Sequence, residues 1–171
     1  MYQNGLGVEK DYKEAIRLYK LSADQGNSFP FNNLGYMCQH GLGIEKDYKE
    51  ALRLYKLSAD QLNSSAQNNL GNMYKKGLGI EKDYNEAIRL YKLSADKGDS
   101  DAQYELANMY KIGLGTEKDY KEAIRLYKLS ADQGNIDARC ELEELYKENM
   151  EEIISILLTL NDEYKEQQKN R

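Results

Sequence analysis

Residues 70–103 read LGNMYKKGLGIEKDYNEAIRLYKLSADKGDSDAQ, and close variants of this unit fill most of the chain. Its glycine-rich loop and its Asp-Tyr pair recur at steps of 36 residues. The first glycine of the loop stands at Gly5, Gly41, Gly77 and Gly113, and the aspartate of the pair at Asp11, Asp47, Asp83 and Asp119. A period of this length indicates a stack of supersecondary units, each burying its apolar face against its neighbours.

Each unit contains two stretches with helical periodicity, 64–76 and 83–97 in the example above, which we call the A helix and the B helix. Gly71 leaves room on the A helix for another helix to approach closely. The apolar residues fall on one face of each helix. They are Ala66, Leu70, Met73 and Tyr74 in the first stretch, and Tyr84, Ala87, Ile88, Tyr91 and Ala95 in the second.

The ends of both helices carry capping and turn signals. Ser64 with Gln67, and Asp83 with Glu86, have the spacing of capping boxes, in which each side chain satisfies a backbone N–H at the helix start. Three glycines are expected at turns with positive φ: Gly77, Gly79 and Gly98. Helices of about 13–15 residues are marginal alone, so we expect packing between successive pairs to stabilise a curved α-solenoid.

With these features the unit resembles a Sel1-like repeat, a slightly longer relative of the tetratricopeptide repeat. The resemblance covers residues 1–148 and implies an all-α, right-handed α–α solenoid with a 36-residue period. The expected divisions are a half-repeat at 1–27, full repeats at 28–63, 64–99 and 100–135, and a half-repeat at 136–148.

The repeat pattern stops after Tyr146, and 149–171 is predicted to form a C-terminal helix. Its apolar face comprises Met150, Ile153, Ile154, Leu157, Leu160 and Tyr164. One interpretation is a cap over the last A helix, as solenoids require. The other is self-association, with a homodimer formed through 150–164, because the segment has more apolar surface than a cap needs.

Bulk composition excludes several classes of function. A net charge of −5 and a pI near 5.1 argue against nucleic-acid binding. The longest apolar run, 153–160, is too short for a membrane span. Two cysteines without metal-ligand spacing favour a reducing compartment, so we expect a cytoplasmic protein. Met1-Tyr2 aligns with Met37-Cys38, which predicts that the chain opens inside a repeat and leaves room for a targeting segment upstream.

The candidate binding surface is a stripe on the A helices, where the repeats differ most, while the B helices are near copies. In tetratricopeptide relatives the matching positions line the concave groove, so the resemblance implies that this stripe does too. Ordinary drift of solvent-facing residues is the alternative. The candidate residues are Phe29, Asn32, Tyr36, Gln39, His40, Asn68, Asn72, Lys75, Lys76, Tyr104, Asn108, Lys111 and Ile112.

This stripe predicts a surface for another protein, as an extended peptide or a helix. Its asparagines suit backbone amides, and its lysines favour an acidic segment. The resemblance implies a non-catalytic adaptor or scaffold with no cofactor and no metal. Alternatives are a structural or self-associating scaffold and, less favoured, a hydrolase like the cysteine-rich relatives, whose paired cysteines this chain lacks.

Residues 29–40 depart most from the repeat. Pro30 and Cys38 replace residues of the core stripe, and Pro30 is tolerable in the first turn of a helix. Phe29, Tyr36 and His40 fall on the candidate stripe, where aromatic side chains make strong anchors. They form either a binding hot spot or a cover for the N-terminal end of the stack. Nearby, Leu62 replaces the glycine of the other repeats.

Overall fold

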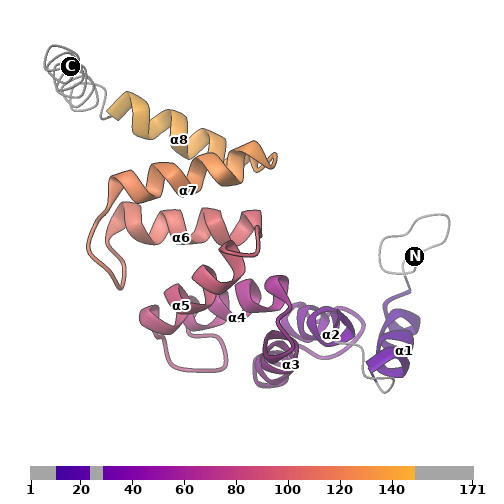
Figure 1. The fold of residues 1–171 in the computed structure, drawn as a ribbon. Helices are drawn as coiled ribbons and strands as arrows, with labels where there is room; N and C mark the ends of the chain where they lie inside the picture. The colour runs from indigo at the N-terminus through magenta and orange to yellow at the C-terminus, as the bar shows by residue number, and fades with distance from the viewer. Residues whose placement is uncertain (1–10, 24–28, 149–171) are drawn as a thin grey trace, which may run out of the picture.

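The computed structural model describes residues 11–23 and 29–148, which form eight α-helices and no strand. The B helices are α1 (Tyr12–Ala23), α3 (Tyr48–Asp60), α5 (Tyr84–Ala95) and α7 (Tyr120–Asp132), and the A helices are α2 (Phe29–His40), α4 (Ser64–Lys76), α6 (Ser100–Ile112) and α8 (Ile136–Glu148). Figure 1 shows them stacked in chain order, with the helix axes turning along the stack, which confirms the predicted all-α solenoid. The predicted C-terminal helix of 149–171 lies outside the described residues.

Aspartate starts the B helices, as the sequence indicates, but the predicted capping box is only half formed. Oδ1 of Asp83 accepts a hydrogen bond from the Glu86 N–H at 3.0 Å. The Glu86 carboxylate, however, binds Arg89 instead of returning to the cap. The Asp83 N–H donates to the carbonyl oxygen of Tyr74, on the preceding A helix, at 3.1 Å. The backbone of the neighbouring helix therefore replaces the second half of the box.

The predicted cap of α4 is wrong by one residue. Asn63, not Ser64, is the N-cap, and its Oδ1 accepts from the Ala66 N–H at 2.9 Å. The Ser64 carbonyl oxygen accepts a hydrogen bond from Oγ of Ser94, on α5, at 2.8 Å. Because Asn63 already caps the helix, Ser64 becomes its first residue and links the two helices of the repeat.

The turns confirm the predicted positive φ values and explain the anomaly at Leu62. Gly77, Gly79 and Gly98 all have positive φ, and Leu62 adopts a φ of 64° in the turn that follows α3. Gly79 has a second constraint, since a Cβ there would lie 2.8 Å from the carbonyl oxygen of Tyr48. Leu62 thus occupies a left-handed conformation that costs an L-residue free energy.

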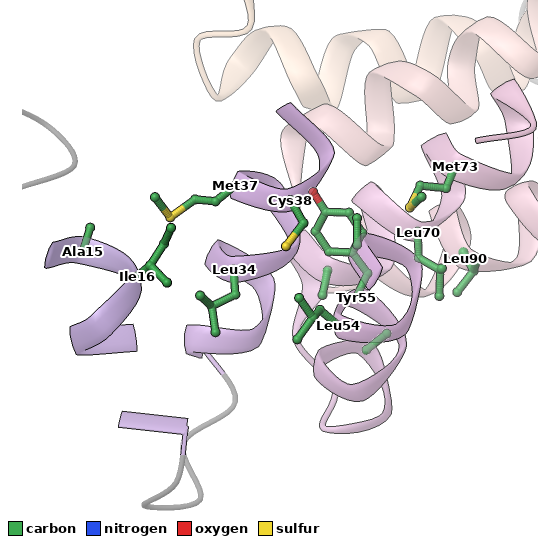
Figure 2. Packing of buried hydrophobic residues seen from close by; sticks show 13 residues of the cluster. Ala15, Ile16, Leu34, Met37, Cys38, Leu54, Tyr55, Leu70, Met73 and Leu90 are labelled. Carbon is green, nitrogen blue, oxygen red and sulfur yellow. The ribbon is translucent and has the colours of Figure 1, made fainter. Parts of the chain in front are cut away.

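The core lies between paired helices and comprises two clusters of buried residues, with the partly buried Tyr74 packed against both. Tyr91, wholly buried, fits against Gly71, where an added Cβ would lie 2.7 Å from Cε1 of the ring. This contact confirms the close approach expected at Gly71. Figure 2 shows the N-terminal part of the core, where Met37 and Cys38 of α2 join Tyr55 of α3 in one buried cluster.

Candidate functional site

Three of the candidate residues hold the buried tyrosines of the B helices. The hydroxyl of Tyr91 donates to Oδ1 of Asn72 at 3.0 Å, and that of Tyr127 donates to Oδ1 of Asn108 at 2.6 Å. The side chain in the first full repeat that corresponds to Asn72 is Tyr36, and there the hydroxyl of Tyr55 donates to Oε1 of Gln39 at 3.0 Å. The acceptor has moved one turn along the A helix.

Burial raises the pKa of the three phenols of Tyr55, Tyr91 and Tyr127, so they remain hydrogen-bond donors well above neutral pH. The side-chain oxygens paired with them therefore accept these hydrogen bonds within the fold. Asn72, Asn108 and Gln39 lie on the stripe that sequence periodicity identified, but part of their hydrogen-bonding capacity is used within the fold. Their hydrogen bonds to the tyrosines hold the B helix against the A helix.

Two candidate lysines form ion pairs between neighbouring A helices. Nζ of Lys75 lies 2.5 Å from Oε2 of Glu105, and Nζ of Lys111 lies 2.7 Å from Oε2 of Glu141. Less than a third of each of the four side chains is exposed, so the pairs are partly shielded from solvent. The positive charge predicted to attract an acidic partner is neutralised within the chain at these two positions.

Sequence reasoning missed the acidic halves of these pairs. Glu105 and Glu141 are 36 residues apart, and each lies 30 residues after the lysine that it binds. That constant separation was a signal that the repeats could have supplied. At the preceding interface the equivalent of Glu105 is Asn69, whose Nδ2 donates to Oδ1 of Asn32 at 3.0 Å. A polar link thus joins successive A helices at all three interfaces.

Asn68 lies in the interior, although the sequence places it on the candidate stripe. Its exposed fraction is 7%, and its Oδ1 has no hydrogen-bond partner among the described residues. The equivalent Tyr104 is half-buried, with its ring centroid 5.9 Å from that of Tyr127. Neither residue presents its full side chain to a partner. Phe29 is the first residue of α2.

Four of the candidate residues whose side chains the structure describes are exposed. His40, Lys76 and Ile112 each end an A helix and occur at steps of 36, and Tyr36 lies one turn before His40. The Tyr36 and His40 rings are in contact, with centroids 4.3 Å apart. Exposed fractions are 41% for Tyr36 and 56% for Ile112. We call these four residues the A-helix row.

The histidine and the two cysteines, whose side chains could serve in catalysis, lie in different environments. His40 contacts Tyr36, whereas Cys38 is buried, and burial together with the nearby Glu50 and Asp47 carboxylates raises the pKa of its thiol. A thiol held protonated is a poor nucleophile. Cys140 is exposed and also free of a disulfide. Within residues 11–23 and 29–148, no cluster of three His, Cys, Asp or Glu side chains could hold a metal ion. No described helix is long and apolar enough to cross a membrane.

Comparison with known proteins gives consistent results. The Sel1 repeat model matches residues 1–27, 32–61, 64–99 and 100–135. A solved Sel1 repeat protein from Oxalobacter formigenes is 38% identical, with a TM-score of 0.78, over 85% of this chain and 60% of that one. A protective antigen of uropathogenic Escherichia coli that displays an SLR fold is 37% identical, with a TM-score of 0.74, over 85% of this chain and 31% of that one.

The chain therefore spans less than two thirds of the length of either relative. The cysteine-rich protein B of Helicobacter pylori, at 21% identity and a TM-score of 0.60, shares the fold over 78% of this chain and 96% of its own. A search of curated proteins found no match to the sequence.

Proposed function

The chain belongs to the Sel1 repeat family, whose members are generally non-catalytic scaffolds for protein interaction, and from this premise we propose that it binds a segment of another protein along the A-helix row. The supporting observation is the exposure of large side chains at positions where the repeats differ. Tyr36 and Ile112 project apolar surface, while the neighbouring members of the stripe are engaged inside the fold. Exposed aromatic and aliphatic groups are typical anchors of interfaces.

The row also suggests what the partner segment contains. Lys76 has no ion pair with the described residues, unlike Lys75 on the same helix. An acidic side chain of the partner placed beside Lys76 would gain a charge-assisted hydrogen bond. An apolar side chain at one end of the partner segment would cover Tyr36 and His40. An apolar side chain at its other end would cover Ile112. The proposed partner is therefore a segment with apolar residues on either side of an acidic one, either extended or helical.

Peptides selected on the wild-type chain from a randomised display library provide ligands for the test. We expect the double variant Tyr36→Ser/Ile112→Ser to weaken their affinity by about tenfold or more, because anchor residues supply most of the binding free energy. The matched control is Leu57→Ser/Leu129→Ser, which removes two similarly exposed leucines from the B helices. It should change affinity by less than about twofold.

Calorimetric titration gives the affinities, and circular dichroism verifies that both variants keep their helices. Equal weakening in both double variants would remove the support for the A-helix row. Weakening only in the control would place the binding surface on the B helices. A further substitution, Lys76→Glu, tests the acidic residue: the affinity of peptides with an acidic centre should fall, and that of peptides without one should not.

Self-association through 150–164 stays a prediction from the sequence. Light scattering of the whole chain and of a chain ending at Asn149 would measure it. An unchanged mass after truncation would contradict the predicted homodimer.

A further inference from the structure

A pocket of about 300 Å³ opens between the B helices α1 and α3, and none of its lining residues belongs to the A-helix row. Phe31, Leu34 and Cys38 line it from α2, and Lys20 and Leu54 line it from α1 and α3. Figure 2 shows the sulfur of Cys38 directed from α2 toward the side chains of Leu34 and Leu54. Ala23 and Ile44 complete the apolar lining, and the charged lining residues are Lys20 and the ion-paired Glu50 and Arg53.

The equivalent cavity two repeats later carries different residues at two of the positions that line both cavities, and Ile44, Asp96 and Leu129 each line only one of the two. Between α5 and α7 the volume is about 270 Å³, and the residues that correspond to Lys20, Leu34 and Leu54 are Lys92, Leu106 and Leu126. There, Tyr110 stands in place of Cys38, and Gln103 in place of Phe31. The first cavity has therefore lost a phenol ring and gained an apolar wall.

The chain itself shows where a ring sits in this environment. Nζ of Lys92 lies 5.8 Å from the ring centroid of Tyr110, and Nζ of Lys56 lies 6.0 Å from that of Tyr74. Each lysine comes from the preceding B helix and forms a cation–π contact. Lys20 occupies the same position before Cys38. The lysine of the contact is therefore present in this repeat, but the aromatic ring is replaced by a cysteine.

The volume is sufficient for an aromatic group. An apolar cavity of about 150 Å³ in another protein holds benzene, so a phenol ring fits well within the space beside Cys38. The walls offer aliphatic and aromatic contact, and the lysine offers a cation at the ring face. Lys20 is exposed, so the edge of the pocket at that residue is open to solvent.

We propose that this pocket is a second protein-binding site, which receives an aromatic side chain of a partner in the place that Tyr74 and Tyr110 occupy in the next two repeats. The ring lies against Leu34, Leu54 and Phe31, and Lys20 covers its face. The site uses none of the residues of the A-helix row. Its occupancy therefore does not depend on the function proposed above.

Two probes test the site on the whole chain: p-cresol, which is the side chain of tyrosine, and N-acetyl-tyrosinamide, which adds the peptide backbone. We expect both to bind weakly, with dissociation constants on the order of millimolar, as suits ligands of this size. Carbon–proton NMR should show shifts at the methyl groups of Leu34 and Leu54. N-acetyl-leucinamide, the control, should bind about tenfold more weakly.

Variants of the chain test the role of the missing ring. Cys38→Tyr places a ring of the chain itself at the position beside Lys20 and should abolish binding there, and Lys20→Met should weaken binding about two- to fivefold through loss of the cation–π contact. Tyr110→Cys should create a second site, with new shifts at Leu106 and Leu126. Lys20→Met keeps the test decisive if Cys38→Tyr does not fold, because Lys20 is on the surface.

Several results would overturn the proposal. They are unchanged binding in Cys38→Tyr or Lys20→Met, shifts at leucines remote from the pocket, and failure of either probe to bind the wild-type chain. Binding of p-cresol without N-acetyl-tyrosinamide would show a site for free aromatic molecules and would reject a partner side chain. Failure of Tyr110→Cys to gain a site would reject the role given to the missing ring.

Discussion

The hydroxyl of Tyr91 donates a hydrogen bond to Oδ1 of Asn72 at 3.0 Å, and this link joins the fully buried ring of a B helix to a half-buried amide of an A helix. The pair recurs as Tyr127 with Asn108. A residue chosen as a candidate binding group is therefore part of the packing between helices. Replacing this asparagine therefore changes the stability of the fold as well as the candidate binding surface.

Asn72→Ala should lower the free energy of unfolding by about 1–3 kcal/mol, because the hydroxyl of Tyr91 loses its acceptor in a place with little access to water. Urea denaturation monitored by circular dichroism measures the change. Adding Tyr91→Phe to Asn72→Ala should cost less than the sum of the two single changes, since both remove the same bond.

Asn68→Ala is the matched control, four residues away on the same helix. Its buried Oδ1 has no hydrogen-bond partner among the described residues, so removing it leaves no partner unsatisfied. We expect a smaller loss of stability than for Asn72→Ala. Equal losses in the two variants would show that the hydrogen bond to Tyr91 is unimportant for stability.

Leu62→Gly should stabilise the chain by about 0.5–1 kcal/mol. The change relieves the left-handed strain of an L-residue, worth about 1–2 kcal/mol, and the greater freedom of glycine in the unfolded chain offsets part of the gain. Leu62 is 70% exposed, so little apolar contact is lost. Thermal denaturation measures the shift, with the reverse change Gly98→Leu as the control. A lower midpoint for Leu62→Gly would contradict the strain at this turn.

Gly79→Ala should destabilise the chain more than Gly98→Ala. Both glycines have positive φ, but only at Gly79 would the new Cβ meet backbone, at 2.8 Å from the Tyr48 carbonyl oxygen. We expect a cost of about 1 kcal/mol at Gly98 from backbone conformation alone and a further 1–3 kcal/mol or so at Gly79 from the clash. Urea titrations of the two variants give the comparison. Equal costs would show that the loop moves away from Tyr48 without penalty.

Cys140 should react with a thiol reagent at least about a hundredfold faster than Cys38 near neutral pH, because Cys140 is exposed to the reagent whereas Cys38 is buried and its thiol is held protonated. Burial is the largest reason for the raised pKa of Cys38, and the charges of Glu50 and Asp47 act in the same direction. Since its folded-state pKa is raised, the protonated thiol favours the folded state below the ordinary thiol pKa. This contribution is lost as the pH rises through the raised value.

The time course of labelling with Ellman's reagent, in the wild-type chain and in Cys140→Ser, measures these rates. The variant should retain only the slow phase. A fast phase in Cys140→Ser would mean that the pocket beside Cys38 admits the reagent and that the thiol ionises there.

Local periodicity was enough to predict the helices and their stacking. The intervals between Leu70, Met73 and Tyr74 depend only on helix geometry, and the resulting face must be buried in any packing. The position of a cap was less certain, since both Asn63 and Ser64 are suitable residues and the preference is local to one turn. The Ser94 hydroxyl, which binds the Ser64 carbonyl oxygen, lies 30 residues away. No local sequence pattern could have predicted that contact.

The repeated letters alone were therefore sufficient for the family, the all-α stack and the boundaries of the helices to within about two residues, because these follow from short-range geometry repeated every 36 residues. Tertiary structure alone separated Asn72, which holds Tyr91, from Lys76, which faces solvent. Both lie on one stripe of one helix, and periodicity assigns them the same side. Their difference depends on the length and direction of side chains from other helices, which meet only when the stack is assembled.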